Sequence, residues 1–347
     1  MDPILSQLPQ VLPQWYGQCA RDLPWRHTHD PYRIWVSEIM LQQTRVEAVK
    51  GYYARFLTKL PTVQALARCD GDALHKLWEG LGYYSRVRNL KKAAQVIVTE
   101  YGGVFPKAHD QILALPGIGP YTAGAIASIA FNAPTPAVDG NVLRLVSRLT
   151  DDPSPIDAPA TKAKVTQTLA EIYPREAGLF TQALMELGAT LCGPNRAPEC
   201  GQCPCKDFCL GFSRGSAQTL PVKAPKKEKR TEEKTVFLLS CQGFYALHRR
   251  ENTGLLAGLW EFPNVSGALS AEEALRQIEQ WQLEPRELKK IIHRKHIFTH
   301  IVWEMEGVYA EINRKDSRFV WMTAEQLEGE AALPTAFRQF WEEEDHV

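Results

Sequence analysis

The sequence predicts a protein of two parts, an all-α region over residues 1–212 and an α+β domain over residues 235–347. Three observations support this division. Apolar residues recur with a helical period as far as about residue 191, and a Ser-, Pro- and Lys-rich stretch covers residues 213–234. From Thr235 the pattern changes to short runs typical of strands, such as residues 236–239 and 244–247. A chain of 347 residues has room for two or three domains.

The bulk composition excludes several classes of protein. Apolar residues make up 44% of the chain, which suffices for a packed core. No apolar run approaches the ~20 residues of a membrane span, so we expect no membrane association. The first ten residues, MDPILSQLPQ, lack a basic segment, so we expect no signal peptide and a cytoplasmic location, where disulfides are rare. The net charge is zero, so any DNA-binding field must be local.

Residues 113–144 contain the strongest motif in the chain. Pro116-Gly117-Ile118-Gly119-Pro120 predicts a tight turn, and the apolar segment 121–131 predicts a helix after it. The free backbone N–H groups at the start of that helix favour an anion such as a phosphate diester. Asp139 precedes another helical pattern and is expected to cap it. The alternative is a helical hairpin with an ordinary cap and no ligand.

Glu38 lies in the middle of an apolar helix face within residues 32–44. A carboxyl group in an apolar setting tends to a raised pKa, which suits a general acid near neutral pH. A surface glutamate on an amphipathic helix is the alternative. Gln42, Gln43 and Thr44 follow near the expected helix end, where neutral hydrogen-bonding groups suit base edges or simply cap the helix.

Three further segments carry candidate contacts to a base. Trp25-Arg26 pairs an aromatic ring with a guanidinium, although Trp25 alone is more typical of a core residue. Residues 78–86, WEGLGYYSR, place two glycines before paired tyrosines. This pattern suits an apolar wedge that fills the gap in an opened duplex, and it equally suits a turn between helices with tyrosines in the core. Glu186, on the expected helix 180–191, either bonds a base edge or faces solvent.

A cysteine cluster follows that helix. Cys192, Cys200, Cys203 and Cys209 are separated by seven, two and five residues, and Cys205 is an extra member. Five of the eight cysteines therefore fall within 18 residues, which favours a metal site over disulfides in a cytoplasmic protein. Four thiolates suit either Zn²⁺ or a [4Fe–4S] cluster, and the spacing alone does not choose between them.

The remainder of the chain is expected to form a linker and a second domain. The linker, residues 213–234, is basic and predicted to be solvated and extended. The domain that follows is expected to contain helices over 271–281 and 334–344, a strand over 301–310 and the segment 296–300 before that strand.

Taken together, these motifs resemble the MutY-type adenine DNA glycosylases of the helix–hairpin–helix, Gly/Pro-Asp superfamily, and the resemblance covers nearly all of the chain. It implies an all-α core with a helix–hairpin–helix at about residues 113–125, a [4Fe–4S] cluster in the loop 192–209, and a Nudix-like domain that recognises the lesion. The implied substrate is adenine opposite 8-oxoguanine or guanine in double-stranded DNA, flipped out of the helix during base excision repair. We expect a monomer associated with the nucleoid.

The resemblance also implies the catalytic roles. Glu38 would protonate the adenine, and Asp139 would stabilise the positively charged sugar. Asn141 would position Asp139 or water, and Tyr121 would pack beside the two acids. In endonuclease III the residue at the position of Tyr121 is a lysine that attacks the sugar, so a phenol there implies a monofunctional glycosylase with little strand cleavage.

The binding residues implied by the resemblance fall into four groups. The flipped adenine would contact Trp25, Arg26, Leu41 and Glu186. The residues that fill the gap and contact the oxidised guanine would be Gln42, Thr44, Leu81 and Tyr83, and a second loop that reads the lesion would be Phe298, Thr299 and His300. A phosphate would contact Gly117, Gly119, Tyr121 and Thr122.

Two features depart from the family pattern. Thr299 stands where the family more often has serine, and its hydroxyl keeps the role. The first cysteine gap is one residue longer than the family's usual six. The expected ligands remain Cys192, Cys200, Cys203 and Cys209, and an exchange with Cys205 stays open.

Three other functions compete with this interpretation. They are a lyase acting on oxidised pyrimidines, a mismatch-binding protein without activity, and an active Nudix hydrolase fused to a helical partner. After Gly258 the chain lacks the Arg-Glu and paired glutamates that bind Mg²⁺ in active Nudix enzymes, so we expect a recognition module.

Overall fold

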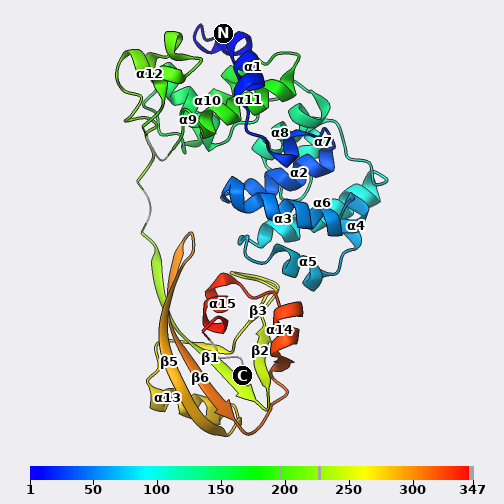
Figure 1. Cartoon of the computed structure of the whole chain (residues 1–347), viewed down its shortest axis with the longest axis vertical. Coiled ribbons are helices and arrows are strands. Elements are labelled where there is room, and N and C mark those ends of the chain that lie inside the picture. Colours follow the sequence, from blue (N-terminus) through cyan, green and yellow to red (C-terminus); the bar gives the residue numbers. More distant parts are fainter. Residues whose placement is uncertain (195–196, 226–227, 344–347) are drawn as a thin grey trace. The chain divides into compact units, whose positions relative to one another are not determined.

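The computed structural model describes residues 1–194, 197–225 and 228–343. The chain forms two compact units, one of residues 1–68 and 88–226 and the other of residues 69–87 and 227–347. The first unit is built of helices, and the second combines a sheet with helices, as Figure 1 shows. The predicted all-α and α+β classes are therefore confirmed, although the second unit also takes in residues 69–87, well before the expected boundary.

The helical unit follows the predicted pattern closely. Its helices are α1 (Leu8–Cys19), α2 (Pro31–Leu41), α3 (Val46–Lys59), α4 (Val63–Arg68), most of α6 (Ser85–Glu100), α7 (His109–Leu113), α8 (Pro120–Phe131), α9 (Gly140–Thr150), α10 (Pro159–Ala170), α11 (Ala177–Ala189) and α12 (Leu210–Ser213). Short 3-10 turns lie at Leu5–Gln7, Pro24–Arg26, Cys200–Gln202 and Lys206–Phe208. Among the described residues, no helix is both long and apolar enough to cross a membrane.

The helical period of the sequence predicts a single amphipathic helix over residues 62–78, but the structure divides this segment into two helices. Helix α4 ends at Arg68, and α5 (Gly71–Trp78) begins after Asp70. The Asp70 side chain accepts hydrogen bonds from the backbone N–H groups of Asp72 and Ala73, which satisfies donors that the new helix leaves open. A periodic apolar pattern runs through both helices and does not reveal this break.

A shared apolar core and close helix contacts fix the region that carries the candidate acids. The core joins α1, α9 and α11 and includes Cys192 and Cys205 of the cysteine loop. Helices α2 and α8 pack against each other. Gly124 of α8 lies so close to the next loop that a Cβ atom there would be 2.1 Å from the carbonyl oxygen of Pro136, three residues before Asp139.

The predicted linker is more ordered than its composition suggests. Ala217 and Leu220 are buried, and the Leu220 carbonyl accepts a hydrogen bond from Arg148 Nε at 3.0 Å. The backbone N–H of Ala224 donates to the carboxylate of Asp157. The far end of the segment, from Arg230, belongs to a strand. Most of the described residues of the segment are nevertheless exposed, so it is held at a few points and is not packed along its length.

The second unit is a seven-stranded mixed sheet with helices on both faces. Its strands are β1 (Arg230–Cys241), β2 (Phe244–Arg249), β3 (Trp260–Glu261), β4 (Asn264–Ser266), β5 (Pro285–Ile297), β6 (Ile301–Ile312) and β7 (Val320–Thr323), and its further helices are α13 (Ala271–Gln280), α14 (Ala324–Glu330) and α15 (Thr335–Trp341). The strand order is β3-β2-β1-β6-β5, with β4 beside β1 and β7 beside β2. Strands β1 and β6 are parallel, and the other pairs are antiparallel.

Alternation along β1 creates the two cores of this unit. Val236 and Leu238 join a cluster with Phe337 and Phe340 of α15, whereas Phe237 and Leu239 join a cluster with Ile278 of α13. Successive side chains of a strand point to opposite faces, so one apolar run supplies both layers. Each fully buried side chain of this size stabilises the fold by roughly 1.5–3 kcal/mol relative to exposure.

Candidate active site

Glu38 and Tyr121 meet where α2 packs on α8. The Tyr121 hydroxyl donates a hydrogen bond to Glu38 Oε2 at 2.5 Å, and Glu38 is only 5% exposed. Burial raises the pKa of Glu38 to about 7, against the opposing effect of the hydrogen bond from Tyr121. The expected raised pKa is thus confirmed, and the alternative of a surface glutamate is wrong. Burial and the nearby carboxylates hold the pKa of Tyr121 well above 10, so the phenol stays a neutral donor.

Asp139 caps α9, as the sequence predicts. Its Oδ1 accepts from the backbone N–H groups of Asn141 at 2.9 Å and Val142 at 2.8 Å, while Asn141 Nδ2 donates to Oδ2 at 2.6 Å. Burial raises the pKa of Asp139, and these hydrogen bonds and the charge of Arg144 oppose that effect. The backbone and side-chain donors all favour the ionised form, which an ordinary surface cap would not need.

One pocket brings Asp139 and the Tyr121 phenol together, and Glu38 is joined to it through its hydrogen bond with Tyr121. Tyr121 and Asp139 line it with Val138 and Leu143, and Lys162 and Lys223 line it too. The charge of Asp139 raises the pKa of Glu38, which places the two carboxyl groups within electrostatic range of each other. Two acids in different environments can divide the roles of proton donor and charge stabiliser.

The predicted hairpin lies directly before α8. Gly117 adopts φ +75°, and a Cβ atom there would be 2.5 Å from Cβ of Asn89, so the turn requires glycine. Gly119 is the N-cap of α8, and Pro120 is its first residue. Thr122 is buried, and its hydroxyl accepts from Gln42 Nε2 at 3.3 Å, so only its backbone is suited to a phosphate.

The end of α2 places the predicted Gln and Thr residues beside this hairpin. Helix α2 ends at Leu41, which is partly buried, and Gln42 is its C-cap. Gln43 has φ +57°, a left-handed conformation that turns the chain sharply. Thr44 Oγ1 donates to the carbonyl of Gln42 at 3.4 Å.

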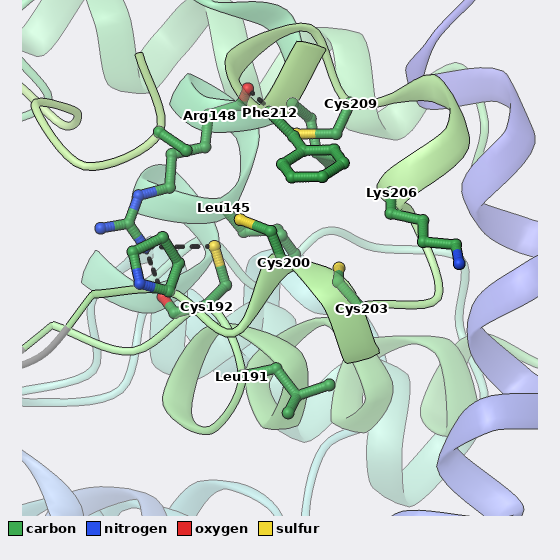
Figure 2. A pocket seen from close by; sticks show the side chains of 12 residues that line it. Leu145, Arg148, Leu191, Cys192, Cys200, Cys203, Lys206, Cys209 and Phe212 are labelled. Carbon is green, nitrogen blue, oxygen red and sulfur yellow. Dashed lines mark hydrogen bonds between the residues drawn. The ribbon is translucent and has the colours of Figure 1, made fainter. Parts of the chain in front are cut away.

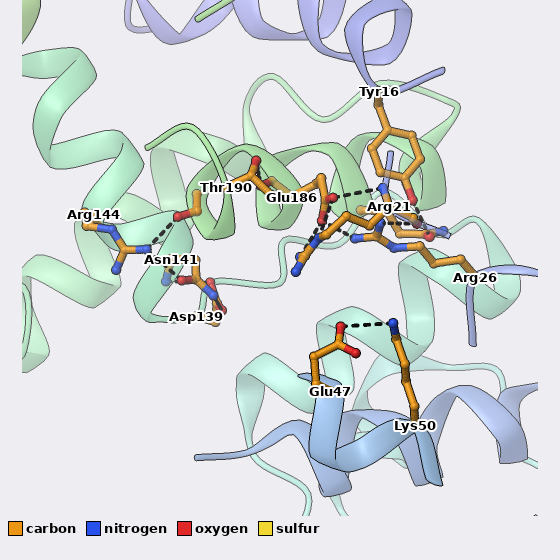
Figure 3. Close-up of polar contacts among 12 residues, drawn as sticks. Tyr16, Arg21, Arg26, Glu47, Lys50, Asp139, Asn141, Arg144, Glu186 and Thr190 are labelled. Atoms are coloured by element: carbon orange, nitrogen blue, oxygen red, sulfur yellow. Dashed lines mark hydrogen bonds and ion pairs between the residues drawn. The ribbon is translucent and has the colours of Figure 1, made fainter. Parts of the chain in front are cut away.

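Glu186 forms a buried ion cluster rather than facing solvent. It is completely buried, and its Oε2 accepts from Arg21 at 2.7 Å and from Arg26 at 2.5 Å (Figure 3). These bonds outweigh burial and lower the pKa of Glu186 to about 2. The solvent-facing alternative is therefore wrong. Trp25 is buried against the Tyr53 ring at 5.5 Å between centroids, as a core residue would be.

Three arginines that contact candidate site residues carry no signal that the sequence analysis recognised. Arg21 belongs to the cluster just described. Arg144 donates to Asn141 Oδ1 at 2.7 Å (Figure 3) and to the Cys192 carbonyl at 2.9 Å. Arg148 Nη1 donates to the same carbonyl at 2.9 Å (Figure 2). Two arginines four residues apart on an otherwise apolar helix would have been a usable signal, because a buried guanidinium is nearly always paired.

Four of the five clustered cysteines line one pocket. Cys192, Cys200, Cys203 and Cys209 share it with Arg148, as Figure 2 shows. The Cys192 Sγ lies 3.2 Å from Arg148 Nη1. Cys205 is fully buried in the apolar core instead. Within the described ranges, no three His, Cys, Asp or Glu side chains converge closely enough to hold a metal ion.

The remaining predicted site residues belong to the second unit. Leu81 is 6% exposed, and the paired tyrosines differ, because Tyr84 is buried whereas Tyr83 is 47% exposed. The core alternative therefore holds for Tyr84 and not for Tyr83. Tyr83 has φ +48°, a conformation that costs a residue with a side chain roughly 1–2 kcal/mol.

Phe298, Thr299 and His300 form the turn between β5 and β6. The Phe298 N–H donates to the Ile301 carbonyl at 2.8 Å, which closes the turn. The Phe298 ring packs on Trp303 at 4.8 Å between centroids. Thr299 and His300 are exposed.

Comparison with known proteins agrees with this geometry. Residues 36–175 match the HhH-GPD superfamily of base excision DNA repair proteins, and residues 235–343 match the NUDIX domain. The chain is 35% identical to the adenine DNA glycosylase of Rattus norvegicus, over 94% of this chain and 75% of the rat protein. It is 32% identical to that of Buchnera aphidicola subsp. Baizongia pistaciae, over 88% of this chain and 86% of the relative.

The helical unit also has a solved counterpart. A thermostable thymine-DNA glycosylase superposes with a TM-score of 0.56 and 28% identity, covering 61% of this chain and 97% of that protein. Because the curated relatives match nearly the whole chain, through both the helical unit and the NUDIX domain, this protein is a DNA glycosylase and belongs to the adenine DNA glycosylase family.

Proposed function

We propose that the protein releases adenine from DNA by hydrolysing its N-glycosidic bond, with adenine opposite 8-oxoguanine or guanine as the substrate, during base excision repair. The observation that carries the proposal is the buried Glu38, hydrogen-bonded to Tyr121 and within the field of the capped Asp139. The family's name supports adenine as the base, and the site supplies the two acids that the reaction needs.

In the proposed mechanism Glu38 donates the first proton. With a pKa of about 7 it is about half protonated at pH 7, so it can transfer a proton to a ring nitrogen of the bound adenine. The C–N bond then breaks, its electron pair leaves with the adenine, and positive charge develops on the sugar. The carboxylate left on Glu38 takes a proton from the attacking water, which restores the acid.

Asp139 stabilises that positive charge. Its three hydrogen bonds from Asn141 and Val142 hold the carboxylate oxygens in place, so little reorganisation is needed as the charge develops. Asn141 is held in turn by Arg144 at 2.7 Å, which makes Arg144 a positioning residue. In this proposal Glu186 orients Arg26 at the adenine pocket, where Trp25 and Leu41 complete the wall.

We further propose that the enzyme is monofunctional. An amine nucleophile is needed for a Schiff base with the sugar, and Tyr121 offers a phenol beside the acids. Lys162 and Lys223 also line the pocket but are exposed. Borohydride trapping should yield no DNA–protein adduct, and an adduct lost in Lys162→Ala or Lys223→Ala would overturn the proposal.

Cys192, Cys200, Cys203 and Cys209 are proposed to hold a [4Fe–4S] cluster. They share one pocket, and soft thiolate donors without imidazole suit iron–sulfur or zinc. Cys205 does not line that pocket, which supports its exclusion from the ligand set. Cys203→Ser should lose bound iron and visible absorbance, whereas Cys205→Ser should keep both. Zinc in place of iron in purified protein would contradict the cluster.

The opposite base is proposed to be read by exposed groups of the second unit. Tyr83, Thr299 and His300 are accessible, and Leu81 supports the Tyr83 turn from below as a largely buried residue. Gln42 and Thr44 are proposed to fill the gap left by the flipped adenine. The turn at Gly117 and Gly119, with the backbone of Tyr121 and Thr122, is proposed to hold a phosphate.

Single-turnover adenine release tests the proposal. The substrate is a duplex with one adenine opposite 8-oxoguanine, compared with adenine opposite guanine and opposite thymine, each with and without alkali. The proposal predicts strand breaks only after alkali and fastest release opposite 8-oxoguanine. Absence of adenine release from every duplex would contradict it.

A further inference from the structure

The loop of residues 79–84, here called the Tyr83 loop, belongs to the same compact unit as the NUDIX domain. It is built to hold one shape. Gly80 and Gly82 have φ +93° and +68°, and Tyr83 is also left-handed. Trp78 Nε1 donates to the Gly82 carbonyl at 3.0 Å.

Arg86 fixes the other side of the loop. Its Nη2 donates to the carbonyls of Leu81 and Gly82 at 3.0 and 3.2 Å. Its guanidinium also lies 5.3 Å from the ring centroid of Tyr83. The loop therefore presents an exposed Tyr83 directly after a backbone that is held at Leu81 and Gly82.

The residue that begins the loop is held by the C-terminal domain. Glu79 Oε1 accepts from the backbone N–H of Leu333 at 2.9 Å and from Arg338 Nη1 at 3.3 Å, and Glu79 Oε2 pairs with Lys76 at 2.7 Å. Lys76 also donates to the carbonyl of Ala331 at 3.1 Å. The Glu79 side chain is only 16% exposed, so solvent screens these contacts less than it screens a surface pair.

A second contact holds the start of α5. Arg249 of β2 donates to both carboxylate oxygens of Asp72, at 2.6 and 3.1 Å. Helix α5 is thus tied to the domain at its first turn by Arg249 and just past its last turn by Leu333 and Arg338.

The groups that hold Glu79 pack on the same apolar core as the Phe298–His300 turn, which is the other segment proposed to read the lesion. Arg338 lies on α15, whose Phe337 packs on Trp303 at 6.0 Å between ring centroids. Trp303 also supports Phe298 at 4.8 Å. One apolar core therefore carries both the Phe298–His300 turn and the anchor of the Tyr83 loop.

We infer that the NUDIX domain has a second role in reading the base opposite the adenine: through Arg338 and Leu333 it positions Glu79, and through Glu79 it fixes the Tyr83 loop. Arg338 and Glu79 are positioning residues for the discrimination of 8-oxoguanine from guanine. The inference rests on the proposed function for its effect on the substrate, but the anchoring of the loop can be measured independently.

The test compares full-length Arg338→Met with Arg286→Met. Arg286 forms an ion pair with Glu311 at 2.7 Å elsewhere in the same domain, and its substitution controls for the loss of an exposed arginine, whereas Arg338 also pairs with Glu328 at 2.7 Å. In protein without DNA, amide hydrogen exchange of residues 79–86 should be about fivefold faster in Arg338→Met, the change expected from losing the contact with Glu79, and unchanged in Arg286→Met. Equal exchange in parent and Arg338→Met would overturn the inference, whether or not the protein releases adenine.

Single-turnover rates supply the second arm. Arg338→Met and Glu79→Gln should each lower the ratio of adenine release opposite 8-oxoguanine to release opposite guanine, with the rate opposite guanine nearly unchanged. The double variant should be no worse than the poorer single variant, because both act through one contact. Equal loss on both duplexes, or additive loss in the double variant, would show general destabilisation and contradict a positioning role.

Discussion

At the scale of single residues, the burial of Glu38 has opposite effects on the proposed catalysis and on stability. It raises the pKa of the carboxyl group, which suits a proton donor, but it lowers the stability of the fold once the group is ionised. The carboxyl group keeps its proton up to about pH 7 in the folded protein, compared with 4.5 for an unperturbed glutamate. The folded state therefore binds more protons between these pH values, and the free energy of unfolding falls as the pH rises through this window. A shift of this size corresponds to roughly 3 kcal/mol, an upper estimate that structural relaxation would reduce.

Glu38→Gln should consequently be much less active and more stable. Loss of the proton donor should slow adenine release by about 10²–10⁴-fold. Removal of the buried carboxylate should raise the melting temperature at pH 8, and this gain should shrink towards pH 5, where the parent carboxyl is protonated. Thermal unfolding at both pH values measures the effect. A melting temperature below that of the parent at pH 8 would mean that the Glu38 carboxylate is not costly.

Asp139 combines a structural and a catalytic role that one substitution can separate. Asparagine is as good an N-cap as aspartate, so Asp139→Asn should keep α9 intact and change the free energy of unfolding by only a few tenths of a kcal/mol. It removes the negative charge that stabilises the sugar in the proposed mechanism, so single-turnover adenine release should fall by at least about 10²-fold. Thermal unfolding and single-turnover assays on the same preparation would distinguish the roles. Near-parental activity in a stable Asp139→Asn protein would leave Asp139 as a cap only.

At the scale of secondary-structure elements, the contact of α8 with the loop before α9 sets the position of Asp139. A Cβ atom at Gly124 would lie 2.1 Å from Pro136 O and 3.2 Å from Cα of Ala137, both backbone atoms. Gly124→Ala should therefore push this loop away, destabilise the protein by about 1–3 kcal/mol, and lower activity even where the protein stays folded.

Gly17→Ala is the matched control for that substitution. Gly17 also lies within a helix, α1, but a Cβ atom there would meet nothing within 4 Å. This change should stabilise the protein by roughly 0.5–1 kcal/mol through helix propensity, and activity should be unchanged. Denaturant unfolding and adenine release compare the two variants. Equal effects of both would show that helix propensity, and not the contact with Pro136, decides the outcome.

Elements with local signals could be predicted from the sequence, and those that depend on distant partners could not. The hairpin at Gly117, the cap at Asp139 and the strands after Thr235 follow from turn chemistry and periodicity. The break between α4 and α5 escaped because the apolar period runs through it, although Asp70 is a cap by type. The points at which the linker is held could not be predicted, because they depend on Arg148 and Asp157, which lie far away in sequence.

The same reasoning applies to the site. The raised pKa of Glu38 could be predicted because its apolar neighbours are adjacent on one helix. Its bond with Tyr121 spans 83 residues, and Glu186 pairs with Arg26 across 160. Periodicity contains no information on such pairs. The resemblance to a family predicted that Tyr121 lies beside Glu38, but it did not predict the ion pair between Glu186 and Arg26.

At the scale of the whole molecule, two units with separate cores divide the proposed work. The helical unit contains Glu38, Tyr121 and Asp139, and the second unit contains Tyr83 and the Phe298–His300 turn. Chemistry and reading of the opposite base thus rest on different cores. A substitution that alters only discrimination should map to the second unit, and one that slows release from every duplex should map to the first.

The central claim is that protonated Glu38 drives adenine release, and the pH dependence of the single-turnover rate tests it most directly. Because the general acid must carry its proton, the rate should fall as the pH rises through about 7, with saturating enzyme and adenine opposite 8-oxoguanine. The residual rate of Glu38→Gln should lack this limb. A rate in the parent that stays constant or increases between pH 6 and 9 would contradict the account.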